Sequence, residues 1–341
     1  MKKILVVCAA MLMLPCLPLR AQEAEDTGTG VSLSVIPRLD ITPEFNDGSG
    51  EFTFGYSSLY TLFEGNITEN LSFSVMNHWA SLWGTDPFGQ ETKDLYNKTF
   101  WHSDTNNWLD WAYLTYETGD WSFTLGKDGL LVGGIEFDDY DFEVHPATAT
   151  TLWNVLPSYQ WGGKIGYALG EQTLLLQVTA SPYGERPFSS GLYSFGLGWN
   201  GSAGNFEWIN AFTLMQTGID GEKTQPVLSL GGRWTPSDAL EVRLDLSNRV
   251  GDYVFLLSKG FMAHPTVTWS FSEKFDLVGT CVFEANTRPD DAVYTWMPGA
   301  GLHWYPLGED RNLRVHATAA YNSTFELTTL SLGVLYNLNL L

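Results

Sequence analysis

The chain has 341 residues, of which 18 are Lys or Arg and 39 are Asp or Glu, giving a formal net charge of −21 at pH 7. This balance excludes a nucleic-acid partner, because phosphate binding depends on Lys and Arg gathered on one face. An acidic surface does not by itself identify another partner, because acidic proteins are also simply soluble.

The N-terminus predicts export from the cytoplasm. Two lysines precede an apolar run over residues 4–19, and a small residue, Ala21, follows shortly after. This is the layout of a signal peptide, so we expect residues 1–21 to be cleaved after Ala21 and residues 22–30 to form a short polar lead-in. Two prolines interrupt the run, which argues against a retained transmembrane helix. A lipoprotein anchor at Cys16 is an alternative that the preceding residues fit poorly.

Loss of the signal peptide changes the charge and the cysteine content. It removes three basic residues, which leaves 15 basic and 39 acidic residues and a net charge of −24. Of the three cysteines only Cys281 remains, so the mature chain cannot form an internal disulfide in an oxidising compartment. Its stability must therefore come from the fold.

Alternation of apolar and polar residues is the pattern that recurs along the mature chain. Residues 240–248 place Leu, Val, Leu and Leu on one face and Glu, Arg, Asp and Ser on the other, and residues 312–322 repeat the theme. This period of two predicts β-strands with two different faces. We expect sixteen strands, at 31–42, 51–63, 70–83, 107–118, 120–128, 160–169, 171–182, 191–200, 204–217, 226–235, 238–249, 262–272, 274–286, 295–306, 311–322 and 327–340.

The strand lengths and the connections predict a membrane-spanning barrel. Most of these strands match or exceed the roughly 9–11 residues that a tilted strand needs to cross a bilayer. The connection after each even-numbered strand is short, whereas those after odd-numbered strands are generally longer, with extremes at 84–106 and 129–159. An even strand number with short turns at one end and long loops at the other is typical of an outer-membrane β-barrel.

Aromatic residues near the short turns support the same interpretation. Amphipathic rings collect at membrane–water boundaries, so these residues predict an aromatic girdle at the short-turn end. Residues of this kind that close the even strands are Phe63, Tyr116, Tyr167, Trp199, Trp234, Trp269, Phe271, Trp304 and Tyr305. Closure of the barrel would pair every backbone N–H and C=O group, as lipid requires. We therefore predict one all-β domain, a transmembrane antiparallel β-barrel over residues 31–341.

The segment FTLGKDGLLVGGIEFD (residues 123–138) resembles porins of the phosphate-selective porin O and P family, in which a Gly-Lys pair leads into a Gly-Gly and acidic loop. The resemblance implies a sixteen-stranded outer-membrane channel, commonly a homotrimer, with the third long loop folded into the pore. In this chain that loop is 129–159. Anion-selective members line the constriction with Lys and Arg, whereas this loop is acidic, so phosphate selectivity is not carried over.

The acidic stretch GGIEFDDYDFEVHP (residues 133–146) has three interpretations. As a pore constriction it would repel anions and concentrate cations, through Glu136, Asp138, Asp139, Asp141 and Glu143. As a Ca²⁺ site it would use the oxygens of Asp139, Asp141 and Glu143, although the glycine of a tight calcium loop is missing. The third possibility is a solvated acidic loop without a ligand.

A few basic residues share the polar faces of the predicted strands. Lys164, Arg233, Arg243 and Arg314 have small or polar neighbours at the same parity, which predicts that they face the lumen. Opposite the acidic loop they would create a transverse field across the constriction. The alternative is that they pair with inward-facing acids such as Glu241, which contributes little at an exposed site.

These observations predict a porin that passes small hydrophilic solutes by diffusion in the outer membrane, in contact with lipid and lipopolysaccharide. No cofactor is required, with Ca²⁺ as the one weak candidate. No catalytic motif is recognised, and the six histidines are scattered, so an enzyme is not expected. The alternative is a non-conducting barrel that binds a ligand or an adhesive partner, or that carries a Ca²⁺-dependent surface enzyme.

Overall fold

The computed structural model describes residues 30–46, 49–53, 57–81, 109–132, 134–138, 148–156, 158–184, 187–219, 222–249, 260–287 and 292–341. The expected signal peptide and the lead-in up to residue 29 lie outside this range. Within the described ranges, no helix is long and apolar enough to cross a membrane.

Within these ranges, almost all of the regular structure is strand. The strands are β1 (Val31–Asn46), β2 (Ser49–Thr53), β3 (Ser58–Thr68), β4 (Leu71–Ser81), β5 (Leu109–Thr118), β6 (Trp121–Gly129), β7 (Tyr159–Leu169), β8 (Gln172–Ala180), β9 (Tyr193–Ala203), β10 (Phe206–Ile219), β11 (Glu222–Ser237), β12 (Leu240–Arg249), β13 (Phe261–Ser272), β14 (Phe275–Thr287), β15 (Ala292–Trp304), β16 (Leu313–Asn322), β17 (Leu327–Tyr336) and β18 (Leu338–Asn339). Two short helices, α3 (Ile135–Asp138) and α4 (Thr151–Val155), lie between β6 and β7.

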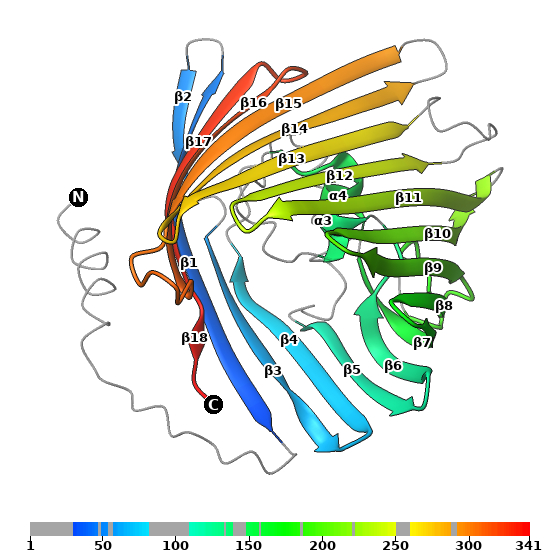
Figure 1. Cartoon of the computed structure of the whole chain (residues 1–341). Coiled ribbons are helices and arrows are strands. Elements are labelled where there is room, and N and C mark those ends of the chain that lie inside the picture. The colour runs from blue at the N-terminus through cyan, green and yellow to red at the C-terminus, as the bar shows by residue number, and fades with distance from the viewer. Residues whose placement is uncertain are drawn as a thin grey trace.

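The strands form one closed antiparallel sheet (Figure 1). Consecutive strands pair in order, and β17 returns to pair with β1. One edge of β1 pairs with β2 along its second half and with β3 along its first half, so these two elements act as a single barrel strand. On the other edge β18 continues the ladder of β17. The eighteen elements thus make a sixteen-stranded barrel, which confirms the predicted fold class.

The sixteen predicted ranges overlap the sixteen barrel strands, with the largest differences at the first hairpin. The second predicted strand, 51–63, is divided into β2 and β3, and β1 continues to Asn46. Four of the eight connections at the long-loop end are long: 82–108, 130–158, 181–192 and 250–260. The connection at 47–48 and the one at 220–221 have two residues each, so the predicted asymmetry depends on those four loops.

Three of the turns at the opposite end are two-residue hairpins with glycine first. Gly119, Gly170 and Gly204 have φ values of 56°, 61° and 60°, in the left-handed region. Positive φ matches the turn to the twist of the flanking strands, and glycine adopts it without steric cost. These glycines therefore account for three of the tight turns at this end.

The outer face carries the predicted aromatic residues. Trp121, Trp199, Trp234 and Trp269 are each close to half exposed, as are Phe271 and Trp304. An apolar face of this kind is stable only against lipid or another apolar surface. Tyr305 is the exception, because it is only 7% exposed and its ring lies under the guanidinium of Arg311 on the inner side.

A buried charged cluster joins β1 to β17, its partner at the closing edge, and to β16 beyond it. Asp40 of β1 is completely buried and accepts hydrogen bonds from His316 Nε2 of β16 at 2.6 Å and Ser331 Oγ of β17 at 2.7 Å. Arg38 forms an ion pair with the same carboxylate. Gly333 pairs with both Asp40 and His316, and a Cβ there would collide with the Asp40 carboxylate. The closing edge is therefore held by side chains as well as by the backbone ladder.

Replacing Asp40 by Ala should lower the free energy of unfolding by about 3–5 kcal/mol, because it leaves the buried Arg38 without its counter-charge. Urea unfolding of the folded barrel in detergent, followed by tryptophan fluorescence, measures this change. The matched control is Asp120→Ala, in an exposed turn, which should leave the midpoint unchanged. Equal midpoints for both variants would show that the cluster does not stabilise barrel closure.

Candidate functional site

The connection between β6 and β7, residues 130–158, turns into the barrel and is called the infolded loop below. Its two helices, α3 and α4, lie within the ring of strands (Figure 1). Helix α3 contacts β11 and β12, which come much later in the sequence than β6 and β7, the two strands that the loop connects. The loop therefore reaches across the lumen to other strands.

Apolar packing holds the base of the infolded loop against the wall. Leu130, Val132, Leu152 and Leu156 of the loop are buried in one cluster. The wall contributes Met215 of β10, Val227 of β11 and Met262 of β13 to the same cluster. Full burial of such side chains stabilises by about 1.5–3 kcal/mol each. These three wall residues face the lumen, so the inner face is apolar where the loop lies.

Polar wall residues bind the loop backbone. Gln177 of β8 donates to the carbonyl of Gly129 at 2.7 Å and accepts from the amide of Leu131 at 3.0 Å. Thr213 of β10 donates to the carbonyl of Leu131. Side chains from two strands thus provide hydrogen-bond partners for the backbone N–H and C=O groups of the loop where it leaves β6, as a buried backbone requires.

Two carboxylates on the wall bind the loop farther along. Asp245 of β12 accepts from the amide of Ile135 at 2.6 Å. Glu284 of β14 accepts from the amide and the hydroxyl of Thr151, at 2.5 and 2.6 Å. These hydrogen bonds hold the first residues of the two helices, so the two acids fix the starts of α3 and α4.

A close approach between two backbones accompanies the Asp245 contact. A Cβ added to Gly231 of β11 would lie 2.6 Å from the Ile135 nitrogen and 2.7 Å from the Gly134 Cα. A Cβ does not approach other heavy atoms this closely, so only glycine at position 231 lets the loop lie directly on the wall.

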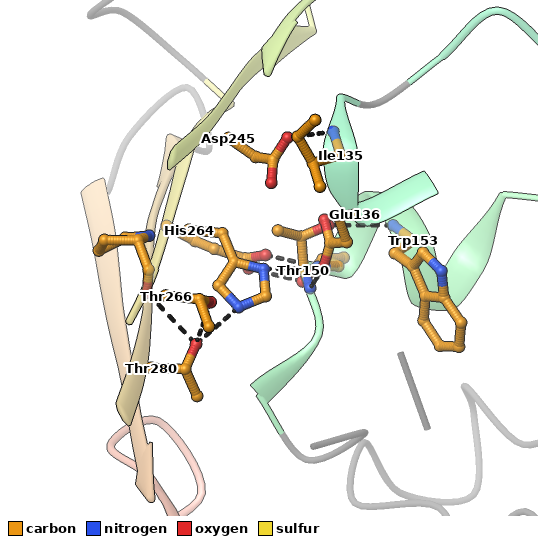
Figure 2. Close-up of polar contacts among 11 residues, drawn as sticks. Ile135, Glu136, Thr150, Trp153, Asp245, His264, Thr266 and Thr280 are labelled. Atoms are coloured by element: carbon orange, nitrogen blue, oxygen red, sulfur yellow. Dashed lines mark hydrogen bonds and ion pairs between the residues drawn. The ribbon is translucent and has the colours of Figure 1, made fainter. Parts of the chain in front are cut away.

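Glu136 is the best-defined of the predicted constriction acids, and Figure 2 shows its surroundings. Its side chain is 5% exposed and accepts from the amide and the hydroxyl of Thr150, both at 2.8 Å. His264 of β13 lies with Nδ1 3.1 Å from Glu136 Oε1 and Nε2 2.8 Å from the hydroxyl of Thr280. Glu136 therefore joins the two parts of the loop to the wall.

The other predicted loop acids are placed only in part. Asp138, at the end of α3, is exposed. Asp139, Asp141 and Glu143 lie outside the described residues, so the Ca²⁺ site that they were expected to form stays a prediction. Within the described part of the chain, no group of three or more His, Cys, Asp or Glu residues is arranged to hold a metal ion.

Three of the four predicted lumen bases form ion pairs with acids of the strands. Lys164 lies 2.6 Å from Asp128. Arg233 lies 3.2 Å from Glu207 and 3.6 Å from Glu241, and Arg243 lies 2.5 Å from Glu241. These pairs run along the wall. The transverse field between the bases and Glu136, Asp138, Asp139 and Asp141 stays a prediction, because Asp139 and Asp141 lie outside the described residues.

Arg314, the fourth predicted lumen base, is 3% exposed. The sequence did not predict a further base of the lumen, Arg311. Arg311 lies in the turn before β16 and donates two hydrogen bonds to Asp276 of β14, at 2.7 and 3.2 Å. Partial burial alone would lower the pKa of Arg311, but the hydrogen bond and the charge of Asp276 outweigh it and raise that pKa. Arg311 was the first residue of the predicted strand 311–322, where parity with Leu313 gave it the outer face. In the structure β16 begins at Leu313, so Arg311 lies in the turn, where parity assigns no face.

A cavity of about 720 Å³ occupies the lumen between the infolded loop and the short turns. It extends from Glu136 and Ala149 of the loop to Asp238 and Asn312 beside the turns. Arg243 and Arg314 line it, whereas Lys164 and Arg233 are not among its lining residues. Its size lies within the roughly 300–1,000 Å³ of small-molecule sites.

Comparison with known proteins shows the fold alone. No protein-family model matches the chain, and no curated protein matches it. Among solved structures, the outer membrane channel DcaP of Acinetobacter baumannii superposes with a TM-score of 0.60 at 12% identity, over 92% of this chain and 99% of that one.

Two further structures share the barrel. A mutant of the Rh. blastica porin gives a TM-score of 0.56 at 13% identity, over 91% of this chain and all of that one. A loop-deletion mutant of OmpT, an outer membrane protein of Vibrio cholerae, gives 0.51 at 11% identity, over 90% and 99%. The barrel is thus the fold of porins, and the structures named here are described as an outer membrane channel, a porin and an outer membrane protein.

Replacing Gly231 by Ala should displace the infolded loop, because the new Cβ meets the backbone of Gly134 and Ile135. Overpacking of this kind costs about 1–3 kcal/mol. Hydrogen exchange should become faster at the amides of Ile135 and Thr151 while exchange in the strands is unchanged.

The matched control for this experiment is Gly279→Ala. Gly279 lies within a strand of the same barrel, but a Cβ there meets no atom within 4 Å. Equal loop exchange in the two variants would contradict the direct contact between the loop and β11.

Proposed function

We propose that this protein is an outer-membrane channel through which small hydrophilic solutes diffuse. The observation that carries the proposal is a closed sixteen-stranded barrel whose lumen holds a loop bound to the wall and, beside it, a cavity of about 720 Å³. In such a channel the width at the loop and the charges of the wall set selectivity, and no covalent chemistry is needed.

The proposal includes the setting that the sequence predicts. The chain is exported under the direction of residues 1–21 and folds in the outer membrane. Its aromatic outer face meets lipid and lipopolysaccharide, and three copies assemble. Support for the membrane setting comes from the exposed tryptophans around the short-turn end.

Selectivity for small ions should be weak, with a preference for cations. Among the described residues that line the cavity, six are Asp or Glu and three are Arg. Two of these arginines, Arg243 and Arg311, are paired with acids at 2.5 and 2.7 Å. A phosphate-selective lumen needs bases available to the anion, so this lining does not favour phosphate.

Planar-bilayer recording across a potassium chloride gradient tests the proposal. We expect stepwise conductance and a small reversal potential of the sign that indicates cation preference. A correctly folded barrel without conductance would overturn the channel, and a strong anion preference would overturn the assignment of selectivity.

Changing Arg233 and Arg243 to Gln together should shift the reversal potential further toward cations, because Glu241 loses both arginine partners. Glu241→Gln should shift it the opposite way, since the two arginines then lack that acid. Lys274→Gln, in an exposed turn, is the matched control for loss of a positive charge. An unchanged reversal potential in both lumen variants would mean that these charges do not lie along the ion path.

A further inference from the structure

The two sides of the lumen cavity differ in chemistry. One side carries the apolar and aromatic residues Ile36, Tyr60, Met76 and Tyr159, from β1, β3, β4 and β7, with one carboxylate, Asp110 of β5, among them. The other side is mainly polar and comes from β11 to β17 and the turns between them, with Leu240, Val278 and Leu335 as its apolar residues. A barrel interior is ordinarily polar all round, so an aromatic inner side calls for an explanation.

Two tyrosine rings line the aromatic side, and each lies next to a second ring. The rings of Tyr159 and Trp111 of β5 lie with their centroids 5.5 Å apart. The ring of Tyr60 lies 6.0 Å from that of His78 on β4. Tyr60 and Tyr159 are each partly exposed and both line the cavity. Aromatic faces of this kind offer a large contact area at a small cost in conformational entropy.

The opposite side offers hydroxyl groups, and two of its acids are paired with arginines. Thr266, Thr268, Ser270 and Thr280 line it. Among its charged residues, Asp276 is bound in two hydrogen bonds by Arg311, and Glu241 is paired with Arg243. An ionic solute would have to compete with these pairs, whereas a hydroxyl group can donate to the acid or accept from the arginine without separating them.

We infer that the cavity binds neutral sugars, with a ring stacked on Tyr159 and Tyr60 and its hydroxyl groups directed to the polar side. A sugar ring has an apolar C–H face and polar edges, which match the two sides of the cavity. The inference rests on the proposed channel function and names its class of solute. The excess of acids over arginines in the lining disfavours anions, which leaves cations and zwitterions as the competing solutes.

The test is block of the ion current by maltotriose, measured on the reconstituted full-length barrel over a range of sugar concentrations. We expect a reversible, saturable decrease in conductance that yields a dissociation constant. Tyr159→Ala should weaken binding roughly tenfold, which corresponds to the loss of one stacking contact. Tyr159→Phe keeps the ring and should stay within about twofold of the parent protein.

The matched control is Tyr321→Ala, because Tyr321 lies exposed on the outer face of β16 and should leave the block unchanged. Should Tyr159→Ala fail to fold, Tyr60→Ala takes its place in the comparison. Glycylglycine and inorganic phosphate serve as zwitterionic and anionic probes.

The outcomes separate the two proposals. Three outcomes would overturn the sugar site while leaving the channel. The first is conductance that maltotriose does not block, and the second is a block that neither Tyr159→Ala nor Tyr60→Ala weakens. The third is a stronger block by glycylglycine or phosphate than by maltotriose. If the barrel is silent, the channel fails, and titration calorimetry with maltotriose on the folded protein decides the sugar site. Heat of binding that is lost in Tyr159→Ala supports the site, and its absence in the parent protein refutes it.

Discussion

The pairing of β1 with β17 is the constraint on which the rest of the structure depends. An open sheet would expose two edges of unpaired backbone groups, which lipid does not tolerate, and closure removes both. Once the sheet is closed, every second residue of every strand faces the same lumen. Strands far apart in the sequence, such as β8 and β14, can therefore bind one loop. The buried Asp40 cluster lies at this closing edge and links β1 to the two strands that precede the C-terminus.

The sequence predicted the strands because a two-sided wall imposes a period of two on side-chain polarity. The departures occur where local geometry interrupts that period. The second barrel strand is divided into β2 and β3. Tyr305 was predicted to lie in the outer girdle together with its neighbour Trp304. In the structure Tyr305 lies in the turn after β15 and points inward, against Arg311. The parity of a residue's position assigns it to a face only inside a regular strand, so it cannot predict the orientation of residues in turns.

The docking of the infolded loop had a signal in the sequence that was not used. Met215, Val227 and Met262 have the parity of lumen-facing residues, yet they are apolar and buried. An apolar residue on a face that is otherwise polar indicates that something packs there. The polar contacts had no such signal, because alternation shows which acids face inward but not which backbone amides meet them. Gly231 is a further contact that the sequence does not signal, since only the structure places it against the backbone of Ile135.

Several acids of the lumen bind the infolded loop or pair with arginines. The acidic composition therefore reflects structural contacts as well as the charge that a passing ion meets. Asp245 and Glu284 bind loop amides, Glu136 joins Thr150 to His264, and Glu241 and Asp276 are paired with arginines. A carboxylate paired with an arginine contributes much less to the field that a passing ion meets than one left free, whereas a hydrogen bond from an amide or a hydroxyl does not cancel the charge. The charge count of the sequence therefore overstates the ionic character of the lumen. What remains available to a solute is mainly hydroxyl groups on one side and aromatic rings on the other, and such a surface discriminates by shape and hydrogen bonding more than by charge.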